Sequence, residues 1–81
     1  MTPPSGLVQS STHDGAAGAR IREIRRDGGL TQQELAAAVE VSRQTIIAME
    51  KGDYAPSVYL ALKVARTLGV TVEELWGASA S

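Results

Sequence analysis

Apolar residues recur with helical spacing through most of the chain, and no segment has the two-residue alternation of a half-buried strand. The clearest stretch is residues 30–52, LTQQELAAAVEVSRQTIIAMEKG, which holds two short helical patterns separated by a break of about three residues. Leu35 and Val39 mark the apolar face of the first pattern, and Ile46 and Met49 mark that of the second. Because so short a break prevents the helices from packing along their lengths, they must cross steeply, which predicts a helix-turn-helix.

Capping residues indicate where these two helices begin. Thr31 and Glu34 have the spacing of a capping box, in which each side chain binds a backbone N–H group of the first turn. Ser42 is the N-cap candidate of the second helix, which we expect from about Ser42 to Glu50, with Gly52 just past its end. The first turn of this second helix carries polar residues, so we expect it to project away from the core.

Three further helices are predicted by similar signals. The first runs from about Gly18 to Arg26 and ends at a Gly-Gly pair, because glycine commonly follows a helix C-terminus. The second, Val58 to Leu68, follows a proline and a serine N-cap, and the third is a short helix from Val72 to Trp76. The expected fold is therefore all-α, a compact domain of five short helices around one core.

The two ends of the chain lack these patterns. Residues 1–17, MTPPSGLVQSSTHDGAA, are rich in Pro, Ser, Thr and Gly, and we interpret them as a disordered leader. Residues 18–77 form the expected domain, and residues 78–81 form a frayed tail. The one histidine of the sequence, His13, lies in the leader, which makes it a poor candidate for a ligand or a catalytic base.

Composition argues against several classes of function. The 81-residue chain has no cysteine, which excludes a disulfide framework and a thiolate metal site, and it has no phosphate-binding loop or metal-ligand cluster. We therefore expect no enzyme activity, no cofactor and no metal. No apolar run approaches the length of a membrane span, and the N-terminus does not resemble a signal peptide, so we expect a cytoplasmic protein without a membrane partner.

The formal net charge of −1 hides an uneven distribution. Arg20, Arg22, Arg25 and Arg26 gather in the first predicted helix, whereas a Glu-Glu pair lies near the C-terminus. These arginines could share one face, although a run of charges is more often only a solvated surface. Charge alone therefore neither supports nor excludes a nucleic-acid partner.

The helix-turn-helix stretch resembles the DNA-binding motif of the phage-repressor family, also called Cro/CI or XRE. The resemblance extends from about residue 20 to residue 76, and the runs SRQTI (residues 42–46), EKG (residues 50–52) and LGV (residues 68–70) are especially close to small stand-alone regulators. It implies a lambda-repressor-like domain and a sequence-specific transcriptional regulator, expected to be a repressor, that binds double-stranded DNA. One departure is Glu40, which stands where the family usually has glycine at the sharp turn between the two helices.

In a helix-turn-helix the second helix enters the major groove, with its N-terminal residues against the base edges. Gln44 can pair with adenine through its amide, and Arg43 can bond guanine or hold a phosphate. Thr45 could contact a thymine methyl group or bond a phosphate, and Ala48 is a further candidate for contact with a thymine methyl group. Ile47 is expected on the exposed side, where it either reads thymine methyl groups or is an ordinary exposed apolar residue.

Other residues are expected to position the protein on the DNA backbone without reading sequence. Family members commonly contact a phosphate at the position of Gln32, in the first turn of the first motif helix, and Ser42 and Lys51 are further candidates. The resemblance also implies a structural salt bridge between Arg25 and Glu50, which would join the first helix to the end of the recognition helix. The alternative is two unrelated surface charges, which would add little stability.

Excess apolar surface near the C-terminus indicates a dimer interface. Leu60 and Leu62 are both candidates for the outer side of the helix 58–68, and Val72 and Trp76 add apolar surface beside a short tail. A single small domain buries little surface on DNA, and phage repressors often dimerise through this region. We therefore expect a homodimer on a pseudo-palindromic operator. Alternatively, Trp76 only closes the core of the monomer.

A second class of function stays open at this point. The protein could be an interaction module, such as an antitoxin or a regulatory cofactor, that uses the apolar face of the helices 58–68 and 72–76 to bind a protein partner. Salt-sensitive binding to a specific operator would favour the regulator, whereas stable binding to another protein would favour the interaction module.

Overall fold

The computed structural model describes residues 16–77, and within that range the chain forms five helical segments and no strand. The described part of the N-terminal helix is residues 16–27. It is followed by α2 (Gln32–Val39), α3 (Arg43–Lys51), α4 (Val58–Leu68) and a short π-helical turn, η1 (Glu73–Gly77). The all-α fold predicted from the sequence is confirmed, and α4 has the bounds that were predicted for it.

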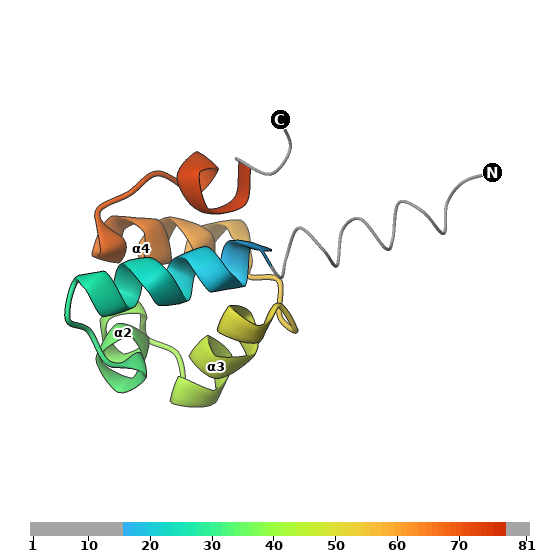
Figure 1. The fold of residues 1–81 in the computed structure, drawn as a ribbon. Coiled ribbons are helices and arrows are strands. Elements are labelled where there is room, and N and C mark those ends of the chain that lie inside the picture. The colour runs from blue at the N-terminus through green and yellow to red at the C-terminus, as the bar shows by residue number, and fades with distance from the viewer. Residues whose placement is uncertain (1–15, 78–81) are drawn as a thin grey trace.

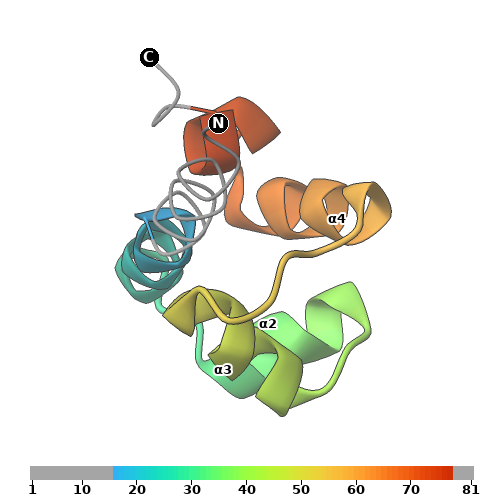
Figure 2. The same cartoon turned by 90° about the vertical axis from the view of Figure 1, so that its right-hand side faces the viewer.

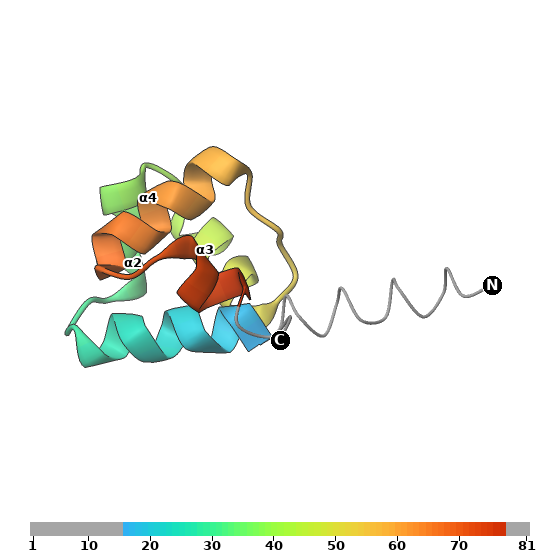
Figure 3. The same cartoon turned by 90° about the horizontal axis from the view of Figure 1, so that it is seen from above.

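In the view of Figure 1 the N-terminal helix crosses in front of α4, and Figures 2 and 3 show that it lies along one side of the molecule. In Figure 2, α2 and α3 lie below this helix, η1 lies above it, and α4 lies to its right. Seen from above, η1 lies beside both the N-terminal helix and α4 (Figure 3). The helix α2 contacts both α3 and α4, so α4 packs against the helix-turn-helix formed by α2 and α3.

One apolar core holds the helices together, and every helical segment contributes to it. Its buried residues are Ile21, Leu35, Ala36, Val39, Ile46, Met49, Leu60, Val64, Ala65 and Leu75. The residue of η1 that enters the core is Leu75, which is fully buried. Trp76 and Val72 pack against this core but stay partly exposed, so Trp76 belongs both to the core boundary and to the surface.

The prediction that Leu60 and Leu62 both lie on the outer side of α4 is wrong for Leu60. Leu60 is only 8% exposed and belongs to the core, whereas Leu62 is 42% exposed. Residues two positions apart on an α-helix point about 200° away from each other, so the two leucines cannot share one face. The packing of α4 against α2 decides which of them is buried.

The N-terminal caps predicted from the sequence are present. The backbone N–H of Glu34 donates to Thr31 Oγ1 at 3.0 Å, and that of Thr31 donates to Glu34 Oε1 at 2.8 Å, which completes a capping box. Ser42 and Ser57 each accept a backbone N–H bond at 3.2 Å, from the residue three positions further along. A second capping box, between Thr71 and Glu74, precedes η1.

The four α-helices, unlike η1, end in the same way, with a left-handed residue and a backbone hydrogen bond that spans six residues. Three of these left-handed residues are glycines, Gly29, Gly52 and Gly69. The fourth is Glu40, which has φ of 63° and is the one non-glycine residue with positive φ among residues 16–77. The sharp turn of the helix-turn-helix is thus built with glutamate in a conformation that favours glycine.

The N-terminal helix extends further back than predicted. Residues 16 and 17 are helical, and Ala17 is 1% exposed, so the prediction of a leader over residues 1–17 is wrong for its last two positions. The remainder of that leader and the tail, residues 78–81, lie outside the described residues. Gly18 lies where the helix meets the end of α3, because a Cβ atom there would be 2.5 Å from the carbonyl oxygens of Met49 and Glu50.

Candidate nucleic-acid interface

The exposed first turn of α3 is the centre of the candidate interface. Ile46 and Met49 anchor α3 in the core with 0% and 2% exposure, so the opposite side of the helix faces outward. Arg43 and Gln44, the two residues with side chains suited to reading bases, are both exposed. Since Ser42 caps this end of α3, both side chains project from a helix start that is already hydrogen-bonded.

The other predicted contact residues of α3 are less open. Thr45 and Ala48 are both half-buried. The hydroxyl groups of Ser42 and Thr45 lie 3.0 Å apart and bond to each other, so one of the two hydroxyl hydrogens stays available to an external acceptor such as a phosphate. Lys51, at the far end of α3, is exposed.

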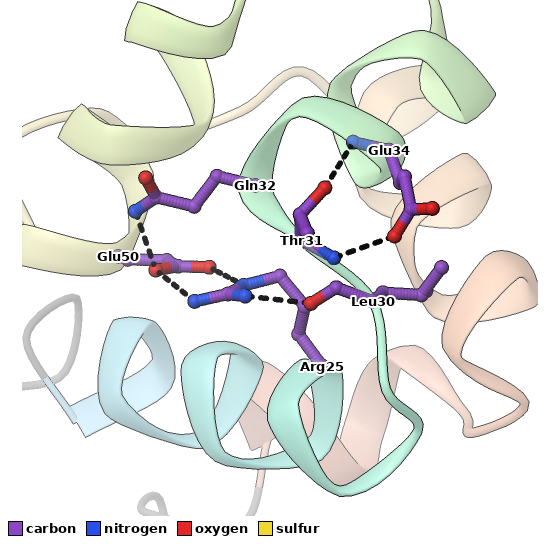
Figure 4. A network of polar contacts seen from close by, with 6 residues as sticks. All are labelled: Arg25, Leu30, Thr31, Gln32, Glu34 and Glu50. Atoms are coloured by element: carbon purple, nitrogen blue, oxygen red, sulfur yellow. Dashed lines mark hydrogen bonds and ion pairs between the residues drawn. The ribbon is translucent and has the colours of Figure 1, made fainter.

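Arg25 and Glu50 lie against each other and link the N-terminal helix to the end of α3 (Figure 4). Arg25 Nε donates to Glu50 Oε2 at 2.6 Å, and Arg25 Nη2 donates to Glu50 Oε1 at 3.3 Å. Arg25 Nη1 also donates to the carbonyl oxygen of Leu30, at 2.7 Å, in the loop before α2. Because the two charged side chains are only 10% and 4% exposed, each depends on the other for compensation of its charge.

Gln32 belongs to the same network. Its Nε2 donates to Glu50 Oε1 at 3.1 Å (Figure 4). The side chain of this first residue of α2 therefore points toward the end of α3. An amide carries two N–H donors and one acceptor oxygen, which leaves one donor and the oxygen for another partner. From the sequence we predicted a phosphate contact for Gln32 but not this internal bond to Glu50.

A hollow of about 400 Å³ lies between the N-terminal helix, the start of α2 and the second half of α3. It is called the basic hollow below, and it is lined by Arg22, Arg25, Arg26, Gln32, Ile47, Glu50 and Lys51. Ile47, whose environment the sequence left open, is half-buried in this lining. A second hollow, of about 510 Å³, shares Arg25 and Gln32 with the first and reaches Arg43. The two hollows therefore follow one face of the molecule.

The turn between α2 and α3 carries an exposed ion pair. Lys63 Nζ of α4 lies 2.9 Å from Glu40 Oε1, with side-chain exposures of 50% and 77%. The hydrogen bond from Lys63, together with its positive charge, lowers the pKa of Glu40 below the usual value of 4.5. This contact holds the left-handed residue of the turn against α4.

Val72 and Trp76, the predicted dimer residues, line an open groove of about 600 Å³ on the other side of the molecule. The helix α4 contributes Leu62 and Val58 to the same groove, with exposures of 42% and 73%. Apolar side chains from α4 and from the C-terminal segment thus form one continuous surface. The structure brings the predicted residues together there, but Leu60 lies in the core instead.

The part of the chain that the structure describes shows no helix that is long and apolar enough to span a bilayer. Within the same range, no group of three or more His, Cys, Asp or Glu side chains is arranged to hold a metal ion.

Residues 21–75 match the model of the helix-turn-helix family, and the chain therefore belongs to that family. The predicted family is thus confirmed. An uncharacterized HTH-type transcriptional regulator of Methanothermobacter thermautotrophicus is 63% identical over 49 residues, which cover 60% of this chain and 71% of that protein. The cryptic phage CTXphi transcriptional repressor RstR of Vibrio cholerae is 36% identical over 56 residues, which cover 69% of this chain and 50% of that protein.

Two solved structures share the fold and a third of the sequence. The clp gene regulator ClgR from Corynebacterium glutamicum superposes with a TM-score of 0.76 at 34% identity, over 84% of this chain and 72% of that chain. The restriction-modification controller protein C.AhdI from Aeromonas hydrophila gives a TM-score of 0.71 at 33% identity, over 75% of this chain and 92% of that chain.

Proposed function

We propose that this protein is a transcriptional regulator, acting as a repressor, that binds double-stranded DNA sequence-specifically and reads the major groove with α3. The observation that carries the proposal is the exposed pair Arg43 and Gln44 on the capped first turn of α3, whose other side is fixed in the core. In this fold that turn meets base edges. A cytoplasmic site of action is part of the same proposal, because the ligand is DNA.

The roles of individual residues follow from their positions. Gln44 and Arg43 contact bases, and the half-buried Thr45 and Ala48 have room only for short contacts with thymine methyl groups. Ser42 and Lys51 contact phosphates. Gln32 contacts a phosphate through the amide atoms that its bond to Glu50 leaves free.

We also propose that two copies bind one pseudo-palindromic operator. The groove formed by α4 and η1, with Leu62, Val72 and Trp76 in its lining, supports a twofold interface between protomers. Such an interface would set two α3 helices about 34 Å apart, which is one turn of DNA. The relatives and solved structures described above are named as gene regulators or controllers, which favours DNA binding over the alternative of an interaction module.

Selection of bound sequences from a random duplex pool tests the function directly. We expect one motif with two related halves, bound more weakly as salt rises. A pool that enriches no motif, together with binding that ignores DNA sequence, would contradict the proposal.

The Gln44→Ala variant tests the placement of α3. It should lose preference at one base pair per half-site, costing on the order of 1–3 kcal/mol against the preferred base. Lys51→Ala is the matched comparison, because loss of a phosphate contact should weaken all sequences alike and leave the selected motif unchanged. An unchanged motif for Gln44→Ala would show that α3 does not read bases as proposed.

A further inference from the structure

The basic hollow contains more positive charge than its surroundings neutralise. Four cationic side chains and one carboxylate line it. That carboxylate, Glu50, already accepts bonds from Arg25 and Gln32. Among residues 16–77 the ion pairs are Arg25–Glu50 and Lys63–Glu40, so Arg22, Arg26 and Lys51 have no carboxylate partner within that range.

The nearest acidic side chains on the N-terminal helix lie outside the basic hollow. Glu23 and Asp27 line a neighbouring hollow, which Arg22 and Arg26 also line, but neither carboxylate forms an ion pair with them among residues 16–77. Arg22, Arg26 and Lys51 are all exposed, so their charges are accessible to a ligand. The basic hollow is therefore an anion-binding surface with one apolar element, the half-buried side chain of Ile47.

We infer that the basic hollow binds the sugar–phosphate backbone of DNA, with Arg22 and Arg26 on phosphates and Ile47 against a deoxyribose. This inference rests on the proposed function and adds the N-terminal helix to its interface. Guanidinium groups suit phosphate oxygens because their planar N–H donors can bond two oxygens at once. A sugar offers carbon atoms to an apolar side chain, which gives Ile47 a contact that a free phosphate would not provide.

The spacing of the arginine side chains fits the spacing of phosphates along one strand of DNA. Arg22 and Arg26 are four residues apart on one helix, about 6 Å along its axis. Phosphates of one DNA strand follow each other every ~3.4 Å along the duplex axis, so the two arginines can contact different phosphates. The neighbouring hollow continues from Gln32 to Arg43. The two hollows together therefore form one extended surface, and the base-reading turn of α3 lies at its other end. A linear polyanion such as a DNA strand matches this extended surface better than a small anion does.

The salt dependence of binding to the selected operator tests the inference. Arg22→Ala and Arg26→Ala should each reduce the magnitude of the slope of log K against log salt by about 0.9 per protomer, which is about 1.8 for two protomers on one operator. The double variant should reduce it by about twice that, with the selected motif unchanged. Lys63→Ala is the matched control, because it removes the same charge from an exposed position on α4 that lines neither the basic hollow nor the groove proposed as the protomer interface. Its slope should equal that of the parent protein.

Several outcomes would overturn the inference. If the double variant has the same slope as Lys63→Ala while the parent still selects a motif, the basic hollow does not contact DNA and only this inference fails. If inorganic pyrophosphate at constant ionic strength raises the melting temperature of the parent but not of the double variant, and the DNA slope is unchanged, the hollow is a small-anion site. A parent protein that selects no motif and binds DNA without salt dependence would overturn the proposed function as well.

Folding of the variants is checked by thermal melting. Arg22 and Arg26 are exposed and have no ion-pair partner among the described residues, so their replacement should leave the melting temperature close to that of the parent. Arg22→Gln with Arg26→Gln serves as a second double variant, which keeps long polar side chains on the helix. It should reduce the slope as the alanine double variant does.

Discussion

At the scale of single residues, α3 is fixed by the buried Ile46 and by contacts of its C-terminal half. Met49 is buried in the core, and Glu50 bonds to Arg25 and Gln32. The backbone of the N-terminal helix comes close to the same end of α3 at Gly18. The orientation of α3 therefore depends on residues that are distant in sequence from its base-reading turn.

Gly18→Ala should destabilise the domain by roughly 1–3 kcal/mol, because the added Cβ would overlap backbone atoms that cannot rotate away. The carbonyl oxygens of Met49 and Glu50 would lie 2.5 Å from that atom. Chemical denaturation gives the free energy of unfolding. Gly28→Ala is the matched control, since its Cβ would meet the oxygen of Ile24 at an ordinary 3.5 Å and should cost little. Equal stabilities of the two variants would refute the close approach.

Glu50→Ala should lower the free energy of unfolding by roughly 3–5 kcal/mol, because Arg25 would keep its charge in a site that is 10% exposed and has lost its partner. For a domain of this size that is a large part of the total stability. Glu23→Ala, which removes the same charge from an exposed position on the N-terminal helix, should change stability little. Thermal and urea unfolding measure the stability of the two variants and of the parent. Indistinguishable melts of the two variants would reduce the Arg25–Glu50 pair to a surface contact.

At the scale of helices, the ends follow local rules with one exception. Glu40 occupies the left-handed position that glycine holds at the other three helix ends. Glu40→Gly should raise the melting temperature by on the order of 4–8 °C, because relief of the left-handed strain outweighs the loss of an exposed ion pair. A melting temperature at or below that of the parent would show that the Lys63 contact matters more than the backbone.

The variant Lys63→Gln separates the ion pair from the backbone effect. Since Lys63 lowers the pKa of Glu40 in the folded state, the stabilisation from this pair is present above pH 4.5 and is lost as the pH falls through the lowered pKa. The difference in melting temperature between the parent and Lys63→Gln should therefore be small at neutral pH, smaller still at high salt, and absent in acid.

Helix ends were predictable from the sequence because caps are local. Thr31, Ser42 and Ser57 each need only the backbone three residues away, and that spacing is visible in the sequence. The orientation of a helix around its own axis depends on neighbours that are distant in sequence. For this reason Leu60 could not be assigned to the core, and the bond from Gln32 to Glu50 was not foreseen.

In the candidate site too, local features were predictable from the sequence and features set by tertiary packing were not. Arg43 and Gln44 follow an N-cap, and their exposure was predictable from that position. Arg22 and Arg26 were visible as part of a cluster of arginines, and their spacing of four residues was the available signal for one face. Only the fold shows that this face lies next to Lys51 and Ile47, because α3 is brought there by tertiary packing.

At the scale of the whole molecule, α3 lies below the N-terminal helix in Figure 2, whereas η1 lies above that helix and α4 to its right. The base-reading turn of α3 and the apolar groove lined by α4 and the C-terminal segment therefore belong to different parts of the surface. A protomer can therefore present α3 to DNA while the groove contacts a second protomer. Trp76 is a poor residue for testing this arrangement, since it packs against the core as well as lining the groove. Leu62 is better suited, because it is exposed and outside the core.

Leu62→Glu should convert the proposed dimer to a monomer, because burying a carboxylate in an apolar interface costs free energy that a pair with Arg66, four residues further along α4, offsets only in part. Analytical ultracentrifugation with and without operator DNA measures the assembly, and two parent protomers are expected per site. Tyr59→Glu is the matched control, since Tyr59 is 80% exposed on the same helix and is not part of the groove lining. One parent protomer per operator, or equal behaviour of the two variants, would contradict a dimer through this groove.

The support of α3 through its second half has a consequence for how such a protein can acquire a new target. Substitutions at Arg43 and Gln44 change exposed side chains that make no contribution to the core. A descendant lineage can therefore vary these two positions and pass through many operator preferences without an unstable intermediate. Substitutions at Met49 and Glu50 have no such freedom. They would remove core packing or the partner of Arg25, and the domain would lose stability whether or not its sequence preference changed.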